Sequence, residues 1–258
     1  MRFSANLGFL WTGLSLPDAI RAARRAGFDA VECHWPYDVP SQLVAAALEE
    51  TGLRMLGLNT RRGEAGENGL SALHGRGKEA RAAIDEAIAY AHATGTGNVH
   101  VMAGFATGEE AHAAFVHALR YACALAAQHG ITILIEPLNR YDAPGYFLTT
   151  TTQAEAIIAE VGADNLKLMF DCYHVQLMEG DVTHRLERLR ALIGHVQIAS
   201  VPDRGAPDHG ELDYGHVLGV LERLGWDAPV GAEYKPVGDT DATLGWLRRM
   251  RDAGAAAR

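Results

Sequence analysis

The segment Ile131-Thr132-Ile133-Leu134-Ile135-Glu136-Pro137 combines a short apolar run with a carboxylate at its end. A run of aliphatic and β-branched side chains favours a strand that is buried on both faces, as in a parallel sheet. The segment Leu168-Met169-Phe170-Asp171 repeats the design, because it also ends an apolar run on an acid. Together the two segments indicate a parallel sheet whose strands carry polar groups at their ends.

Short β-branched runs of this kind alternate with alanine-rich helical stretches along the whole chain. The expected strands are residues 2–7, 30–33, 54–58, 98–102, 132–136, 166–171, 194–198 and 230–234. The expected helices are residues 17–26, 41–51, 78–94, 109–129, 152–161, 182–192, 214–224 and 241–252. Eight such units in 258 residues take about 32 residues each, which suits a closed (β/α)₈ barrel. An open doubly wound sheet is the alternative, but its first strand usually runs into a glycine-rich phosphate loop, and residues 6–10 do not form one.

Glycine residues support this architecture, because they stand where five of the expected helices should end, at positions 27, 52, 130, 162 and 225. No linker interrupts the pattern. We therefore expect one α/β domain over residues 1–258, a single (β/α)₈ TIM barrel. The irregular stretch at about 59–77 contains five glycines, and in a barrel it would be a loop over the mouth.

The composition excludes several classes of protein. The chain has 23 Lys and Arg against 32 Asp and Glu, a formal net charge of −9, and 48% hydrophobic residues. This balance gives no broad basic face for nucleic acid or for an acidic membrane surface. No apolar run approaches the roughly 20 residues of a membrane span, and the first residues lack the apolar core of a secretory signal. We therefore expect a cytoplasmic protein without nucleic-acid or membrane partners, with three reduced cysteines that form no C-x-x-C pair.

Polar side chains end four consecutive expected strands, and in a barrel the carboxyl ends of all strands converge on one mouth. They are Glu136, Asp171, Gln197 and Glu233. Three carboxylates held close would raise one another's pKa values, so a divalent cation between them is the economical explanation. An all-oxygen set of ligands favours Mg²⁺ or Mn²⁺ over zinc. Taken singly, each acid could instead cap its strand or pair with an arginine.

Several motifs, spread over nearly the whole chain, carry a resemblance to a known family. They include Gly27-Phe28-Asp29-Ala30-Val31-Glu32, Gly69-Leu70-Ser71-Ala72-Leu73-His74-Gly75-Arg76, Ile135-Glu136-Pro137-Leu138-Asn139, Asp171-Cys172-Tyr173-His174, Gly194-His195-Val196-Gln197-Ile198-Ala199 and Glu233-Tyr234-Lys235-Pro236. In these motifs the chain resembles the hydroxypyruvate isomerase family, within the larger group of xylose-isomerase-like TIM barrels. The resemblance implies a metal held by Glu136, Asp171, Gln197 and Glu233, with Glu136 and Glu233 also serving as the catalytic pair that transfers protons.

The implied reaction is a metal-dependent isomerisation of hydroxypyruvate, a small 2-oxo acid, to 2-hydroxy-3-oxopropanoate (tartronate semialdehyde). A base must remove a proton from the carbon that bears the hydroxyl, and an acid must return a proton to the neighbouring carbon. A cation stabilises the enediolate between these steps. Glu136 and Glu233 can be this pair, and the order in which they act stays open.

Four further residues are candidates for binding the substrate. His174 could donate a hydrogen bond to a substrate oxygen, although a purely structural role is the alternative. Arg204 could hold the substrate carboxylate in a protein of net negative charge, or it could be a solvated loop arginine. Lys235 could add a second positive charge at the end of the last strand, or lie flat on the rim. Glu32 ends the second expected strand and could contact a substrate hydroxyl.

Other activities on a similar barrel stay open at this point. The 2-oxo-tetronate isomerases resemble the chain at residues 69–76 and 99–104, and they also act on a 2-oxo acid with a neighbouring hydroxyl. A ketose 3-epimerase would use two glutamates and a metal in the same way, but its third ligand is more commonly His where this chain has Gln197. Arg61 and Arg62 stand in the mouth loop where relatives more often carry small residues or proline, which favours a more anionic or longer substrate.

Two further classes fit the residues less well. A barrel like endonuclease IV would need more histidines at the strand ends and a basic face for DNA, and the chain shows neither. A non-catalytic protein that binds sugars or carboxylates could also hold a metal, but the presence of both Glu136 and Glu233 argues against it. Barrels of this kind often form homo-oligomers, and the sequence does not decide the oligomeric state.

Overall fold

A computed structural model describes residues 1–256 of the chain. Within these residues, eight parallel strands form one sheet in the order β2-β1-β8-β7-β6-β5-β4-β3. They are β1 (Phe3–Asn6), β2 (Ala30–Glu32), β3 (Gly57–Asn59), β4 (Asn98–His100), β5 (Thr132–Ile135), β6 (Leu166–Asp171), β7 (Ile193–Ile198) and β8 (Val230–Ala232). Each expected strand is present, although β3 begins at Gly57 rather than at residue 54.

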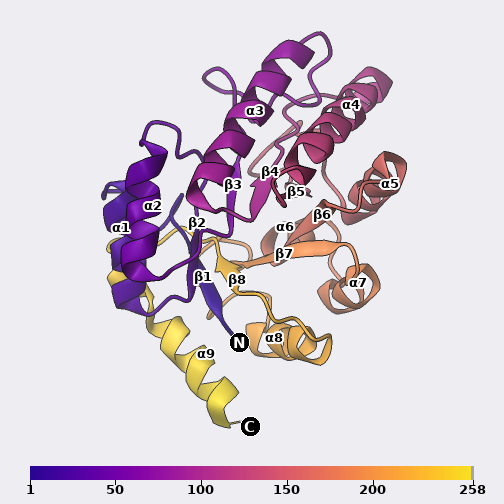
Figure 1. The fold of residues 1–258 in the computed structure, drawn as a ribbon. Helices are drawn as coiled ribbons and strands as arrows, with labels where there is room; N and C mark the ends of the chain where they lie inside the picture. Colours follow the sequence, from indigo (N-terminus) through magenta and orange to yellow (C-terminus); the bar gives the residue numbers. More distant parts are fainter. Residues whose placement is uncertain (257–258) are drawn as a thin grey trace.

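The ring of strands closes between β2 and β3. Val31 forms a parallel bridge with Met55, and Leu56 N donates a hydrogen bond to Val31 O at 2.7 Å. One step further along, Cys33 N donates to Gly57 O at 3.1 Å. The sheet is therefore a barrel with the helices around it (Figure 1), and this confirms the predicted (β/α)₈ architecture.

The helices follow the strands in alternation. They are α1 (Leu16–Ala26), α2 (Ser41–Thr51), α3 (Gly77–Thr94), α4 (Gly108–Ala127), α5 (Thr151–Val161), α6 (Cys172–Met178), α7 (Val182–Leu189), α8 (Tyr214–Arg223) and α9 (Gly245–Ala256), with a 3₁₀ turn, η1 (Asp241–Thr243), before α9. The predicted helix 182–192 ends early, at Leu189, and the predicted helix 241–252 is divided into η1 and α9. Within residues 1–256 we find no helix whose length and apolar character would let it cross a membrane, and the compartment stays a prediction.

The short helix α6 has no counterpart among the expected elements. The apolar run of β6 continues into residues 172–175 without a glycine or proline, so the sequence contains no turn signal there. Asp171 both ends β6 and caps α6, because its side chain accepts a hydrogen bond from Tyr173 N at 2.9 Å. As a result, His174 lies at the mouth of the barrel, where it lines a cleft.

The last helix packs on the first strand and its neighbours. Trp246 of α9 meets the ring of Phe3 in β1 edge to face, with the ring centroids 5.3 Å apart, and it also contacts Phe28. All three side chains are buried. The beginning of α9 therefore packs beside the first strand, and the rest of the helix extends outward to the C-terminus (Figure 1).

The segment between β3 and α3, residues 60–76, lies against the end of β4. Gly69 forms an antiparallel bridge with Ala103, and Thr60 N donates to His100 O at 2.9 Å. Gly69 has a φ of +117°, and a Cβ atom there would lie 2.5 Å from Met102 O, so this close approach requires glycine. The segment places Arg62 at the mouth of the barrel.

Candidate active site

A cleft of about 350 Å³ opens at the carboxyl ends of the strands. Its lining comes from the ends of every strand except β4 and from the segments that follow them. Acidic and basic side chains face one another across it, because Glu136 and Glu233 share the lining with Arg62, Arg204 and Lys235. The carboxyl end of a (β/α)₈ barrel is the place where such enzymes carry their active sites.

The four strand-end residues expected to bind a metal are all buried at this end of the barrel. Glu136 directly follows β5, Asp171 ends β6, Gln197 is in β7 and Glu233 directly follows β8. Each has one buried side-chain oxygen without a hydrogen-bond partner among the described residues: Glu136 Oε1, Asp171 Oδ2, Gln197 Oε1 and Glu233 Oε2. Burying an unpaired polar atom costs free energy, so four such oxygens on one strand-end layer fit a cation well. Three of the four residues, Glu136, Gln197 and Glu233, also border an interior cavity of about 20 Å³.

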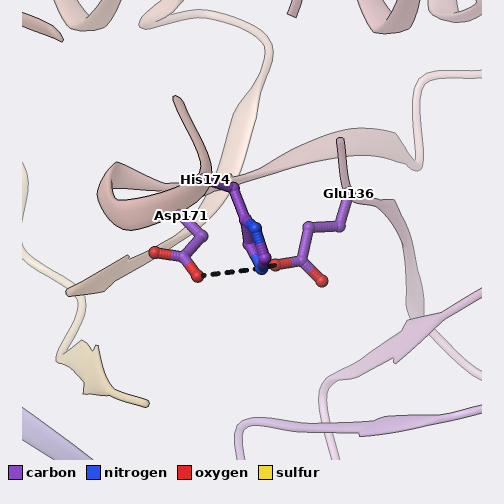
Figure 2. A group of neighbouring side chains, drawn as sticks. All are labelled: Glu136, Asp171 and His174. Carbon is purple, nitrogen blue, oxygen red and sulfur yellow. Dashed lines mark ion pairs between the residues drawn. The ribbon is translucent and has the colours of Figure 1, made fainter. Parts of the chain in front are cut away.

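His174 lies between two of the carboxylates, as Figure 2 shows. Its Nε2 is 3.5 Å from Asp171 Oδ2 and 3.8 Å from Glu136 Oε1. One ligand atom from each of these three buried residues lies within 4.8 Å of the other two, so this group could hold a metal ion. The sequence predicted Asp171 and Glu136 as ligands, and the structure adds His174 to their immediate surroundings.

The hydrogen bonds of Asn139 decide which ring nitrogen of His174 carries the proton. Asn139 Oδ1 accepts from the backbone N–H groups of Tyr141 and Asp142, which fixes the orientation of its amide. His174 Nδ1 then faces two donors, Asn139 N at 3.0 Å and Asn139 Nδ2 at 2.7 Å, and must be the acceptor. Burial, and after it the guanidinium of Arg204, lowers the pKa of His174 to about 3. The single proton of this neutral ring therefore sits on Nε2, so the 3.3 Å approach of Arg204 NH2 to that nitrogen is a contact between two donors, and His174 can donate a hydrogen bond into the site.

Arg204 is held at the site by its backbone and by two aromatic rings. It has a φ of +55°, a region that non-glycine residues rarely occupy. The turn is fixed because Arg204 N donates to Ser200 O at 3.0 Å and Arg204 O accepts from Lys235 N at 2.8 Å. The guanidinium lies 5.0 Å from the ring centroids of both Phe9 and Tyr173. Such backbone strain concentrates at functional sites, where the surrounding structure holds it in place.

The guanidinium of Arg204 brings positive charge to three carboxylates, those of Glu233, Asp171 and Asp142. Its NH2 atom lies 3.3 Å from Glu233 Oε2 and 3.8 Å from Asp171 Oδ2, and NH1 lies 3.3 Å from Asp142 Oδ2. Its buried Nε atom has no hydrogen-bond partner among the described residues. Arg204 therefore both offsets the acids and keeps a donor for an anionic ligand.

The carboxyl groups of Glu136, Asp171 and Glu233 differ in their affinity for protons. Burial and the nearby charges of Glu233 and Asp171 raise the pKa of Glu136 well above its usual range. Burial, together with Glu233, raises the pKa of Asp171 to about 7. Burial acts in the same direction on Glu233, but Arg204 and a hydrogen bond from His34 outweigh it and hold the pKa of Glu233 at about 2. The site therefore favours an ionised Glu233 beside carboxyl groups that need a further positive charge to ionise.

The remaining predicted residues take different positions. Lys235 lines the cleft, as does Arg62, whose guanidinium lies 4.7 Å from the ring centroid of Trp35. Arg61 pairs instead with Glu86 on α3, so only one of the two loop arginines faces the cleft. Glu32 does not line the cleft, and both of its oxygens are engaged by buried side chains. The substrate contact proposed for Glu32 therefore has no support in the geometry.

Three histidines in or after the strands were not among the predicted site residues. His34 Nε2 hydrogen-bonds to Glu233 Oε1 at 2.8 Å. His100 ends β4 with its Nδ1 3.6 Å from Glu136 Oε2, and His195 pairs with Glu32. The strand-end rule would have selected His34, which directly follows the expected strand 30–33, whereas His100 lies inside the expected strand 98–102 and ends β4 only in the structure.

Gly8 makes room for His34. A Cβ atom at residue 8 would lie 2.1 Å from His34 Nδ1, far inside any real contact distance. The absence of a side chain at residue 8 therefore leaves the space that the imidazole ring of His34 occupies.

Comparisons with known proteins agree on the type of fold, and the curated relatives are named isomerases. A family model described as a xylose isomerase-like TIM barrel matches residues 20–250. The chain is 44% identical to 2-oxo-tetronate isomerase of Cupriavidus necator, over 96% of this chain and 97% of that protein. It is 38% identical to hydroxypyruvate isomerase of Escherichia coli, over 97% of this chain and 100% of that protein. A crystal structure described as an AP endonuclease, family 2, from Brucella melitensis superposes with a TM-score of 0.93 at 38% identity, over 96% of this chain and 98% of that one.

Proposed function

The chain belongs to the xylose isomerase-like TIM barrel family and is an isomerase, and from this premise we propose that it interconverts hydroxypyruvate and 2-hydroxy-3-oxopropanoate with a bound Mg²⁺ or Mn²⁺. One observation carries the proposal. Four strand-end residues each bury an oxygen that has no hydrogen-bond partner among the described residues. Two of them are glutamates that line the cleft, so the same group offers both metal ligands and groups that transfer protons.

The donor set fits a hard divalent cation. Glu136, Asp171, Gln197 and Glu233 would hold it through oxygen atoms, which Mg²⁺ and Mn²⁺ prefer. When bound, the cation supplies Lewis-acid stabilisation of the negative charge that develops on the substrate oxygens. The added positive charge would also lower the proton affinity of Glu136 and Asp171, because their raised pKa values arise partly from neighbouring negative charge.

The two glutamates move the proton between carbons. In the forward direction, one carboxylate takes a proton from C3 of hydroxypyruvate and the other carboxyl gives one to C2. The hydroxyl proton passes from O3 to O2, so that C3 becomes the aldehyde and no atom is gained or lost. Glu136 and Glu233 extend from β5 and β8, which lie three places apart in the ring, and so they can approach a substrate from different sides.

Other residues of the cleft bind and orient the substrate in this proposal. Arg204, Lys235 and Arg62 supply positive charge for the substrate carboxylate in a protein whose net charge is −9. His174 Nε2–H donates to a substrate oxygen, because Asn139 occupies the other ring nitrogen. The aromatic rings of Phe9 and Trp35 exclude water from one side of the cleft.

A four-carbon 2-oxo acid is a second candidate substrate, because the chain is 44% identical to 2-oxo-tetronate isomerase of Cupriavidus necator. The three cationic side chains that line the cleft, Arg62, Arg204 and Lys235, suit an acid of either length. Arg62 in the lining of the cleft would supply positive charge for this longer substrate, and 2-oxo-tetronate is the acid to compare.

Proton NMR in D₂O tests the proposed reaction. Purified protein with Mg²⁺ should convert hydroxypyruvate to tartronate semialdehyde that carries deuterium at C2, since the proton-donating glutamate exchanges with solvent. Addition of EDTA should stop the conversion. Glu187→Gln is the control for the Glu→Gln variants of the site. It changes an exposed glutamate on α7 and should leave the rate unaltered. The proposal fails if hydroxypyruvate and 2-oxo-tetronate both stay unchanged with metal present, and conversion of the second acid alone would reassign the substrate.

A further inference from the structure

We propose that Glu32 is a positioning residue. It determines that the oxygen, and not the NH₂ group, of the Gln197 side-chain amide faces the metal ion. The inference rests on the proposed function, because it concerns the cation of that site. Glu32 is buried at the end of β2, and Gln197 Nε2 donates to Glu32 Oε1 at 3.1 Å. A glutamine amide presents either an oxygen or an NH₂ group to a ligand, and only the oxygen binds a cation.

The neighbours of Glu32 fix the direction of this hydrogen bond. Asn6 Oδ1 accepts from Gly8 N at 2.9 Å, so the NH₂ group of Asn6 points toward Glu32. Asn6 Nδ2 donates to Glu32 Oε1 at 3.2 Å, which makes this oxygen an acceptor. The second oxygen, Oε2, is engaged with His195 Nε2, and any proton that the pair shares lies there.

These contacts determine the orientation of the Gln197 side-chain amide. Its NH₂ group must face Glu32 Oε1, because the reverse orientation would bring two acceptor oxygens together at hydrogen-bond distance. The carbonyl oxygen Oε1 is then the free end of the amide, and it is the atom of Gln197 that is buried without a partner among the described residues. The orientation required of a metal ligand is therefore imposed by a carboxylate on another strand.

Gly231 on β8 supplies the space for this arrangement. A Cβ atom at residue 231 would lie 2.5 Å from Glu32 Oε1 and 2.9 Å from both Glu32 Oε2 and His195 Nε2. Gly231 is also the ladder partner of Gln197 between β7 and β8. The need for glycine here comes from the buried Glu32 and His195 pair, and it is an observation independent of the hydrogen bonds.

A double-mutant cycle on Mn²⁺ affinity tests the inference on the full-length, metal-free protein. Isothermal titration with Mn²⁺ would be carried out for the wild type, Glu32→Leu, Gln197→Ala and the double variant. We expect Glu32→Leu to weaken Mn²⁺ binding about 10- to 100-fold, the usual effect of removing a group that orients a metal ligand. In the Gln197→Ala background the same change should have little further effect, because the amide that it orients is absent.

Two further variants separate positioning from simple loss of charge. Glu32→Gln should bind Mn²⁺ nearly as well as the wild type, since its amide oxygen can accept from both Asn6 and Gln197. Glu187→Leu removes an exposed charge and should leave affinity unchanged. If Glu32→Leu does not fold by circular dichroism, Gly231→Ala takes its place in the cycle, because the added methyl group displaces the Glu32 carboxylate.

The outcomes distinguish the inference from the proposed function. An equal loss of affinity with and without Gln197 would show that Glu32 acts by charge, and it would overturn the inference alone. Unchanged affinity in both Glu32→Leu and Gly231→Ala would overturn it as well. A wild-type protein that binds no Mn²⁺ would overturn the proposed metal site and the inference together.

Discussion

The ends of β5 and β8 carry the same residue in equivalent places and give it opposite properties. Glu136 and Glu233 each follow directly on a strand, and each is 6% exposed. The pKa of Glu136 is raised well above its usual range by burial and by neighbouring carboxylates. The pKa of Glu233 is held at about 2, because Arg204 and His34 outweigh the same burial.

The difference shows that partners, and not burial, decide the charge of each glutamate. Glu233 has a hydrogen bond from His34 at 2.8 Å and the Arg204 guanidinium at 3.3 Å. The histidines nearest to Glu136, His100 and His174, stay at 3.6 and 3.8 Å. A pair of carboxyl groups whose surroundings separate their pKa values is the usual basis for distinct acid and base roles.

Removal of either carboxyl group should have the largest effect. We expect Glu136→Gln and Glu233→Gln each to lower kcat about 10³-fold, within the range for loss of a positioned general acid or base. The change keeps the size of the side chain and removes its ability to take a proton. Turnover followed by NMR checks this prediction. A variant that keeps more than a tenth of wild-type activity would show that its glutamate only binds metal or substrate.

Removal of the metal tests the proposed metal site, to which both strand ends contribute a glutamate. Mg²⁺ at about 100 times its dissociation constant should stabilise the fold by about 2.7 kcal/mol. For a chain of this size, that corresponds to a rise in Tm of roughly 5–11 °C. Calorimetry with Mg²⁺ and with EDTA measures the shift, and Asp171→Asn should reduce it. Identical melting curves in both buffers would contradict an oxygen-ligand site.

Arg204, whose guanidinium lowers the pKa of Glu233, can be replaced directly. We expect Arg204→Met to lower kcat/KM about 10- to 100-fold, since hydrogen bonds to charged groups contribute about 1.5–3 kcal/mol. Arg204→Lys should restore only part of the loss, because an ammonium group cannot stack between Phe9 and Tyr173 as the planar guanidinium does. Steady-state kinetics would decide, and full activity in the lysine variant would mean that charge alone matters.

The hydrogen bond from His34 can be disturbed without changing His34 itself. Gly8→Ala would place a methyl group 2.1 Å from the His34 ring and push it away from Glu233. We expect kcat to fall about 10-fold and the free energy of unfolding to drop by about 1–3 kcal/mol, as for overpacking elsewhere. Gly13→Ala, in the same loop with no atom near its Cβ, is the matched control. An active Gly8→Ala enzyme would show that the His34 contact is dispensable.

The smallest effect concerns the turn that carries Arg204. Hydrogen bonds with Asp203 and then Asp208 raise the pKa of His209 above its usual 6.5. A raised folded pKa means that this contribution to stability is present below about pH 6.5 and is lost as the pH rises through the folded pKa. NMR titration should show a raised midpoint for His209, which Asp203→Asn should lower. Turnover should change less than twofold, and an unshifted midpoint would argue against the contact.

Local sequence patterns were sufficient for the architecture and for the identity of the strand-end acids. Runs rich in aliphatic and β-branched residues, such as residues 131–135, favour strands, and a barrel brings all strand ends to one mouth. The helix α6 was missed because β6 continues into it without a turn signal. The surroundings of Glu136 and Glu233 could not be predicted, since His34 and Arg204 reach Glu233 from the loops after β2 and β7.

The sequence by itself therefore determined the eight-fold alternation, the acidic strand ends and the resemblance to isomerases. Only the tertiary structure decided that Glu32 holds the amide of Gln197, that Asn139 fixes the proton of His174, and that Arg204 lies between the carboxylates. The physical reason is the range of the interactions involved. Strand and helix patterns depend on neighbours in the chain, whereas charge and hydrogen-bond direction at the mouth depend on groups from different strands that meet only in the folded barrel.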